Sequence, residues 1–130
     1  MHFPFAFDPR YVRYLAPLGI RPERAWVDVD ERRLDVRFGR WRLSTPVANI
    51  ADTCITGPYA SALRAIGPRI SLADRGLTYG TNTERGLCIL FREPVPSGAT
   101  LGVVKHPGLT VTVADVDNLA AAIRERRRGS

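Results

Sequence analysis

Apolar side chains occupy every second position over residues 25–29 and again over residues 34–38, and this alternation constrains the fold more than any other feature. A period of two places successive side chains on opposite faces of an extended strand. The two segments, with a polar turn between them, therefore predict a β-hairpin with one apolar face. Trp41 and Leu43 continue the alternation after Gly39, so the chain is expected to fold around a β-sheet.

Later segments show the same strand pattern. A polar connection at residues 74–76, which includes a glycine, separates two short apolar segments and predicts a second hairpin. Residues 86–92 are apolar at both alternating sets of positions, so we expect this strand to be central and covered on both faces. The further strands are expected over residues 52–56, 70–73, 77–80, 86–92 and 109–113.

Helical spacing is clearest at the C-terminal end. Asp115 is a suitable N-cap, and apolar residues follow it at positions i, i+3, i+4 and i+7. These apolar residues are Val116, Leu119, Ala120 and Ile123. The pattern predicts an amphipathic helix over residues 115–127 that packs on the sheet. A short middle helix is expected over residues 59–66, and prolines limit the N-terminal segment to a turn or two near residues 9–16.

These segments predict a mainly β fold of the α+β type. We expect an antiparallel sheet or half-open barrel of about seven strands, with a short middle helix and a C-terminal amphipathic helix. The 130 residues suit one domain with a core large enough to need no disulfide or metal. An N-terminal arm, residues 1–23, is expected to pack on a single barrel-like domain, residues 24–128.

The net charge of +6 is concentrated near the C-terminus, at Arg124, Arg126, Arg127 and Arg128. Clustered arginines bind nucleic-acid phosphates or anionic lipid headgroups, so these four residues are a candidate site for an anion or a partner. The alternative is a solvated helix end, because cations stabilise a helix C-terminus through its dipole. All but one of the 19 Lys and Arg residues are arginines, which favours GC-rich codon usage over selection for a nucleic-acid surface.

Charges of both signs also follow the first strands. Arg37, Arg40 and Arg42 are expected to share the outer face of the sheet with Asp28 and Asp35. Cross-strand ion pairs between them would explain the arginines without a ligand.

The two cysteines, Cys54 and Cys88, each lie in an apolar or Thr-rich strand segment. A free cysteine in such a segment usually behaves as a small buried hydrophobe, so we expect two core thiols. A disulfide is the alternative if the two strands are neighbours, and the sequence leaves that distance open.

No arrangement of residues in the sequence forms a catalytic, metal or cofactor signature. His2 and His106 are the only histidines, and neither has Cys or Asp partners at metal-ligand spacing. A nucleophilic set built from a cysteine and His106 lacks the local motif that would activate the thiol. The sequence therefore favours a non-enzymatic protein without a cofactor.

Four polar residues form a second candidate site, a pocket mouth. Thr56, Tyr59, Asn82 and His106 are expected near strand ends and in turns. They would line a ligand pocket if one end of a barrel brought them together. Turn formation alone is the alternative explanation for these residue types.

The order of antiparallel strands followed by the helix at residues 115–127 resembles the pleckstrin-homology-like barrels of bacteria. Short phrases of the chain are also similar to those of uncharacterised proteins from high-GC actinobacteria. These phrases are Asn49-Ile50, Thr56-Gly57-Pro58-Tyr59 and Gly86-Leu87-Cys88-Ile89. The pleckstrin-like resemblance implies a binding or scaffolding module that contacts a peptide, a protein or a headgroup.

The sequence thus predicts a non-enzymatic binding or scaffolding module with a protein or peptide partner. Weak contact with an anionic membrane or nucleic acid through the basic tail is a further expectation. The alternative is a small barrel that encloses an apolar small molecule, or an enzyme that uses such a pocket. Its walls would include Trp26, Trp41, Tyr79 and Phe91. We expect a soluble, cytoplasmic protein, because no apolar segment has signal-peptide or membrane-spanning character.

Overall fold

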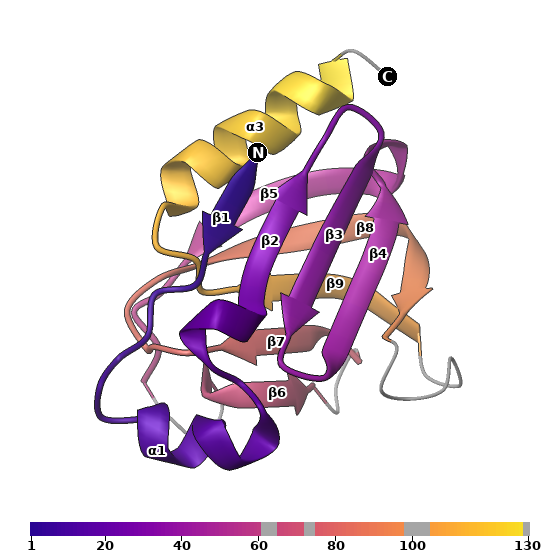
Figure 1. Ribbon diagram of the computed structural model, residues 1–130. Helices are drawn as coiled ribbons and strands as arrows, with labels where there is room; N and C mark the ends of the chain where they lie inside the picture. Colours follow the sequence, from indigo (N-terminus) through magenta and orange to yellow (C-terminus); the bar gives the residue numbers. More distant parts are fainter. Residues whose placement is uncertain (61–64, 72–74, 98–104, 129–130) are drawn as a thin grey trace.

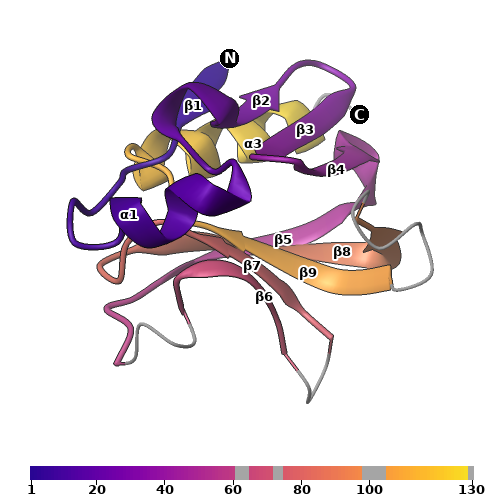
Figure 2. The ribbon, with the colours of Figure 1, turned by 60° about the horizontal axis from the view of Figure 1, so that its bottom comes forward.

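The computed structural model describes residues 1–60, 65–71, 75–97 and 105–128. Within these residues, nine strands form two facing sheets and a C-terminal helix lies along one side of them (Figure 1, Figure 2). The mainly β fold of the α+β type that the sequence predicts is confirmed. In the described part of the chain the two sheets stay separate and do not close into a barrel.

The first sheet is an antiparallel meander in the order β1-β2-β3-β4. Its strands are β1 (His2–Pro4), β2 (Ala25–Val29), β3 (Arg33–Phe38) and β4 (Trp41–Pro46). The last three are the strands that the alternation predicts. Val27 lies opposite Val36, and Val36 lies opposite Leu43, so these apolar side chains share one buried face. Gly39 takes a φ of 64° as the first of two turn residues between β3 and β4.

The second sheet has the order β5-β8-β9-β7-β6. Its strands, in that order, are β5 (Ile50–Thr56), β8 (Gly86–Pro96), β9 (Lys105–Val111), β7 (Leu77–Gly80) and β6 (Gly67–Ile70). β7 and β9 run parallel, and the other neighbours are antiparallel. The predicted second hairpin forms from β6 and β7, but β6 ends at Ile70, where the expected strand begins. Ile70 pairs with Leu77, and residues 72 and 73 of the expected strand lie outside the described part of the chain.

β8 has a neighbour on each side, but only one of its faces is covered. Leu87 and Ile89 are fully buried, whereas Leu90 is 44% exposed and Cys88 is partly exposed. The expectation that both faces of this strand are covered is therefore wrong. The first sheet and the C-terminal helix pack on the same side of the second sheet (Figure 2), and the side chains of Cys88 and Leu90 point away from both.

The C-terminal helix predicted from the spacing of apolar residues is confirmed as α3 (Val116–Arg128). Asp115 caps it, because its carboxylate accepts a hydrogen bond from the backbone N–H of Asn118. The apolar stripe that includes Leu119 and Ile123 is buried. The helix packs against β5, β8 and the 3-10 helix η3 (Val47–Asn49).

The first 24 residues add a strand and short helices to this frame. After β1, the chain forms α1 (Val12–Leu15), η1 (Ala16–Leu18) and η2 (Pro22–Arg24). Phe3, Phe5 and the side chains of Leu15 and Ile20 are buried in the core. Phe5 also forms an isolated bridge with Val113, so the N-terminal segment contacts both the first sheet and the segment before α3.

The predicted middle helix over residues 59–66 falls largely on residues 61–64, which lie outside the described part of the chain. Of its flanks, Tyr59 and Ala60 are not helical, and Ala65 is.

Stacked aromatic rings join the two sheets at the centre of the core. Phe38 of β3 stacks on Tyr79 of β7 with ring centroids 4.8 Å apart and an interplanar angle of 10°. Phe5 also packs against Phe38, with ring centroids 5.2 Å apart in a tilted arrangement. Burial raises the pKa of the Tyr79 hydroxyl, which keeps this residue neutral in the folded protein. The three rings connect the first sheet, the second sheet and the N-terminal segment.

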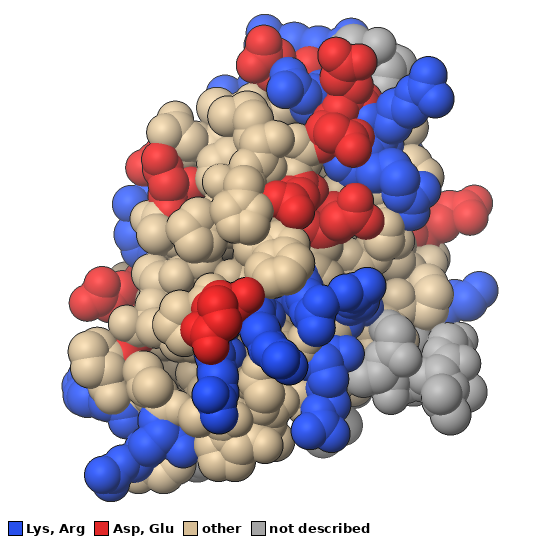
Figure 3. Space-filling model, viewed as in Figure 1, with Lys and Arg blue, Asp and Glu red and all other residues tan. Residues whose placement is uncertain are grey.

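The outer face of the first sheet carries both acidic and basic side chains (Figure 3). The register places Asp28 opposite Asp35 and Arg37 opposite Arg42, so like charges face each other across the strands. The guanidinium of Arg37 instead lies 5.5 Å from the Trp26 ring centroid. Among the described residues, no ion pair joins these arginines to these aspartates, and Asp28 pairs with His2 instead. The expected cross-strand ion pairing is therefore wrong, because the register places like charges opposite each other.

We predict that Phe38→Ala lowers the free energy of unfolding by about 3–5 kcal/mol, because it removes a buried ring that contacts both Phe5 and Tyr79. Urea denaturation followed by tryptophan fluorescence measures this loss. Tyr14→Ala removes a ring that is 65% exposed and serves as the control, with a change within about 0.5 kcal/mol. Equal effects of the two substitutions would contradict the central role of the stack.

Candidate functional site

Three of the four candidate arginines on α3 project from one side of the helix. Arg124, Arg127 and Arg128 are spaced i, i+3 and i+4, which are neighbouring positions on a helix surface. Arg126 falls on another side and does not line the same cavity. Three of the four arginines predicted as a cluster therefore belong to one site, and Arg126 does not.

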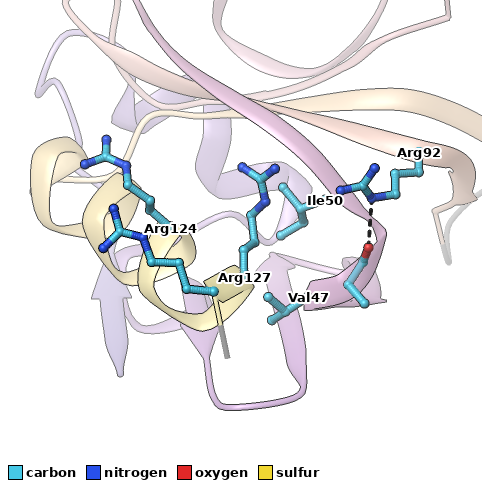
Figure 4. Close-up of a pocket in the computed structure, with 7 residues that line it drawn as sticks. Val47, Ile50, Arg92, Arg124 and Arg127 are labelled. Atoms are coloured by element: carbon cyan, nitrogen blue, oxygen red, sulfur yellow. Dashed lines mark hydrogen bonds between the residues drawn. The ribbon is translucent and has the colours of Figure 1, made fainter. Parts of the chain in front are cut away.

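The three arginines border a cavity of about 430 Å³ between the end of α3 and the second sheet (Figure 4). Arg92 of β8 contributes a fourth guanidinium from the opposite wall, and Val47 and Ile50 form a floor that is fully buried. The lining residues are Val47, Ala48, Ile50, Arg92, Arg124, Arg127 and Arg128. They come from four elements, η3, β5, β8 and α3, so the site depends on how these elements pack.

Arg127 is anchored to the backbone of β5. One of its terminal nitrogens donates a hydrogen bond of 2.6 Å to the carbonyl oxygen of Ala51. The β5–β8 register shifts between Ile50 and Asp52, which leaves Ala51 as an extra residue in the ladder. A bulged residue is unpaired within the sheet, so its carbonyl can accept a bond from outside the sheet. The bulge thus positions one wall of the cavity.

Arg92 is oriented from the other side of the cavity. Its Nε donates a 3.1 Å hydrogen bond to the carbonyl oxygen of Ala48, as the dashed line in Figure 4 shows. A guanidinium has five N–H donors in a planar fork, and this bond uses only one of them. The terminal nitrogens of Arg92 therefore retain donors for a ligand in the cavity.

Asn49 holds η3 against β8 and so maintains the shape of the cavity. Its side-chain oxygen accepts a 2.9 Å bond from the backbone N–H of Glu93, and its side-chain nitrogen donates a 3.0 Å bond to the Glu93 carbonyl. The same nitrogen also donates to the hydroxyl of Thr45 at 3.0 Å. Residues 49 and 93 are distant in sequence, so this clamp fixes a long-range contact.

The electrostatics of the cavity favour an anion. None of the seven lining residues is acidic, and four of them carry a positive charge. The C-terminus of α3 contributes a partial negative charge of roughly half an elementary charge, which opposes an anion there but is much smaller than the charge of four guanidinium groups. Arginine forks bind the two oxygens of a carboxylate or phosphate through parallel hydrogen bonds.

The four residues of the predicted pocket mouth do not meet. The hydroxyls of Thr56 and Tyr59 are hydrogen-bonded to each other, beside Gly86 on the outer side of the second sheet. Burial raises the pKa of the Tyr59 hydroxyl, and the bond from Thr56 partly offsets this effect. His106 is fully buried near the start of β9, where its Nδ1 lies 2.7 Å from the carbonyl oxygen of Arg75. His106 is at the start of β9, whereas Asn82 hydrogen-bonds to the carbonyl oxygen of Thr112, past the end of β9, and Tyr59 lies beside Gly86 near Thr110.

The side chain of Asn82 forms hydrogen bonds with backbone groups. Its side-chain nitrogen donates a 2.8 Å bond to the carbonyl of Ala6, and its oxygen accepts one of 2.9 Å from the backbone N–H of Glu84. It also borders a second cavity, of about 370 Å³, with the N-terminal segment. There the Asp8 carboxylate pairs with Arg10 at 2.8 Å, and this hydrogen bond lowers the pKa of Asp8. Glu84 also lines this cavity, so two acidic residues stand beside one arginine and the lining does not favour an anion.

The cysteines are not the two core thiols that the sequence predicts. Cys54 is exposed and Cys88 is partly exposed, and the strand register places them directly opposite each other. Cys88 alternates with the buried Leu87 and Ile89 of β8, so it lies on the outer face of the second sheet, and Cys54, opposite it in the register, shares that face.

Comparisons with known proteins give no match. No family model matches the chain, and neither a curated protein nor a solved structure is similar to it. Among the described residues, no group of three or more His, Cys, Asp or Glu is arranged to hold a metal ion. In the same part of the chain, every helix is too short or too polar to cross a bilayer. The arginine-lined cavity is thus identified by its geometry alone.

Sequence reasoning missed Arg92 and the apolar floor. The spacing of Arg124, Arg127 and Arg128 was sufficient to separate them from Arg126. No local pattern distinguishes Arg92 from other strand arginines, because its partner Ala48 lies 44 positions away.

We predict that Asn49→Ala lowers the free energy of unfolding by about 1–3 kcal/mol, because it leaves both backbone groups of Glu93 without their partner. Urea denaturation gives the value. Asn118→Ala is the matched control, since its amide bonds only the exposed Asp115 carboxylate and its loss should change the stability by less than about 0.5 kcal/mol. If Asn49→Ala is as mild as the control, the clamp does not hold η3 in place.

Proposed function

We propose that this chain is a non-enzymatic binding module that recognises an acidic or phosphorylated segment of a protein partner. The observation that carries the proposal is the convergence of four arginines on one cavity whose lining includes no acidic residue. The oxyanion of such a segment would accept hydrogen bonds from Arg92 on one wall and from Arg124 and Arg128 on the other.

The shape of the cavity favours a protein partner over a nucleic acid. Strands of nucleic acid bind in extended basic grooves in which aromatic side chains stack on the bases. None of the seven described residues that line this cavity is aromatic, and its arginines are gathered around one concave site. A membrane surface is also disfavoured, because the apolar side chains Val47 and Ile50 form a buried floor rather than an exposed rim.

The alternative of an enclosed apolar pocket receives less support. Of its expected wall residues, Tyr79 and Phe91 are buried in the packed core and Trp41 packs against that core. Trp26 lies on the outer face of the first sheet beneath Arg37. The four aromatic residues therefore do not surround one space.

We also propose that the protein is pleckstrin-homology-like and cytoplasmic, as the sequence leads us to expect. A succession of antiparallel strands followed by one C-terminal helix supports the likeness. The parallel pairing of β7 with β9 departs from a simple succession of hairpins.

We predict that the triple variant Arg92→Gln, Arg124→Gln and Arg128→Gln weakens binding of a fluorescent peptide rich in phosphoserine and glutamate by at least about tenfold, because it removes three charge-assisted donors. Fluorescence anisotropy measures the affinity at low and physiological salt. Arg127 is kept because it anchors α3 to β5. Replacement of Arg13, Arg40 and Arg42 by Gln makes the same change in net charge at exposed positions and should weaken binding less than about twofold.

Equal losses in the two triple variants would show that binding follows net charge and not the cavity. Duplex DNA and phosphatidylserine vesicles form two further arms of the experiment. If either binds more tightly than the peptide, and the cavity variant abolishes that binding, a protein partner is the wrong class of ligand.

A further inference from the structure

Two thiols face each other across the β5–β8 pair on the outer face of the second sheet. Cys54 is paired in register with Cys88, and these are the only cysteines in the chain. Free cysteines are among the most buried residues in proteins, so two exposed or partly exposed thiols at opposed positions are unusual for a packing role. Neither side chain belongs to the core cluster.

The strand geometry permits a bond between them. Directly opposed residues of an antiparallel pair have Cα atoms roughly 4.5–5.5 Å apart, and disulfides join Cα atoms that are roughly 4.4–6.8 Å apart. Their Cβ atoms, at about 4.5–5.5 Å, must approach by up to about 1 Å. β5 is an edge strand with a bulge at its start, so it has one ladder neighbour and can make this adjustment.

We propose that Cys54 and Cys88 are a modification site that peroxide oxidises to an intramolecular disulfide and that thiol reductants restore. The more exposed thiolate, Cys54, attacks the peroxide, whose O–O bond breaks and releases hydroxide, and Cys54 becomes a sulfenic acid. The Cys88 thiolate then attacks the Cys54 sulfur and displaces the second hydroxide. Two protons from the thiols convert the hydroxides to water, so two thiols and one hydrogen peroxide give one disulfide and two waters.

The bond would join the edge strand β5 covalently to β8 and close a loop of about 35 residues. The segment between the two cysteines includes β6, β7 and the loop that carries Tyr59. Closing a loop of this length reduces the conformational entropy of the unfolded chain. The oxidised protein is therefore expected to resist unfolding of this half of the second sheet. The inference stands on the register of two strands and is independent of the arginine-lined cavity.

The experiment treats the purified full chain with increasing hydrogen peroxide, blocks remaining thiols with a maleimide, and records the intact mass. We expect a monomer that loses two hydrogen atoms, takes up no maleimide, and recovers both reactive thiols after dithiothreitol. The melting temperature of the oxidised form should rise by roughly 5–10 °C. Cys54→Ser and Cys88→Ser are near-isosteric controls, and neither should show the mass loss or the rise.

Three results would overturn the proposal. The chain could gain oxygen atoms at equal doses without losing hydrogen, it could form only disulfide-linked dimers, or both cysteines could still react with maleimide after oxidation. A second arm with glutathione disulfide separates the outcomes further, since a mixed disulfide that persists on Cys54 would show that Cys88 does not reach it.

Discussion

The stack of Phe38 on Tyr79 is the contact on which the rest of the structure depends. Each sheet has one apolar face, and an isolated sheet of this kind exposes that face to water. The two rings, with Phe5 beside them, lie where the inner faces meet, and their burial joins strands that are distant in sequence. Because both sheets turn most of their apolar side chains towards this centre, their outer faces carry the exposed side chains that are available for function.

The position of α3 follows from the same constraint. The first sheet covers part of the inner face of the second sheet, and the apolar stripe of α3 packs on β5 and β8 beside it. The polar sides of the helix then face outward, and its last turn comes next to η3. The arginine-lined cavity arises at this junction, where a buried apolar floor ends and three guanidinium groups of the helix meet Arg92. The packing of these elements brings the arginines together. The bulge at Ala51 and the hydrogen bonds of Asn49 hold the elements in place.

The two proposed sites lie on the same strand pair. The cavity is built around the end of β5 that begins with Ile50, and Cys54 lies a few positions further along β5, opposite Cys88 of β8. β5 is the edge strand of its sheet and is supported by β8 on one side and by contacts with α3. An edge strand held in this way can serve both functions, because its backbone accepts a bond from Arg127 while its outward side chains remain accessible.

Local periodicity was enough to determine the class of fold, three strands of the first sheet and the whole of α3, because alternation and helical spacing are properties of neighbouring residues. The sequence also located three of the cavity arginines, since their spacing on a helix is local. Only the tertiary structure decided that there are two sheets, that β8 is open on one face, that Cys54 lies opposite Cys88, and that Arg92 joins the helix arginines. Each of these depends on which distant segments pack together, and that choice is made by burial of the whole apolar surface rather than by any short stretch of sequence.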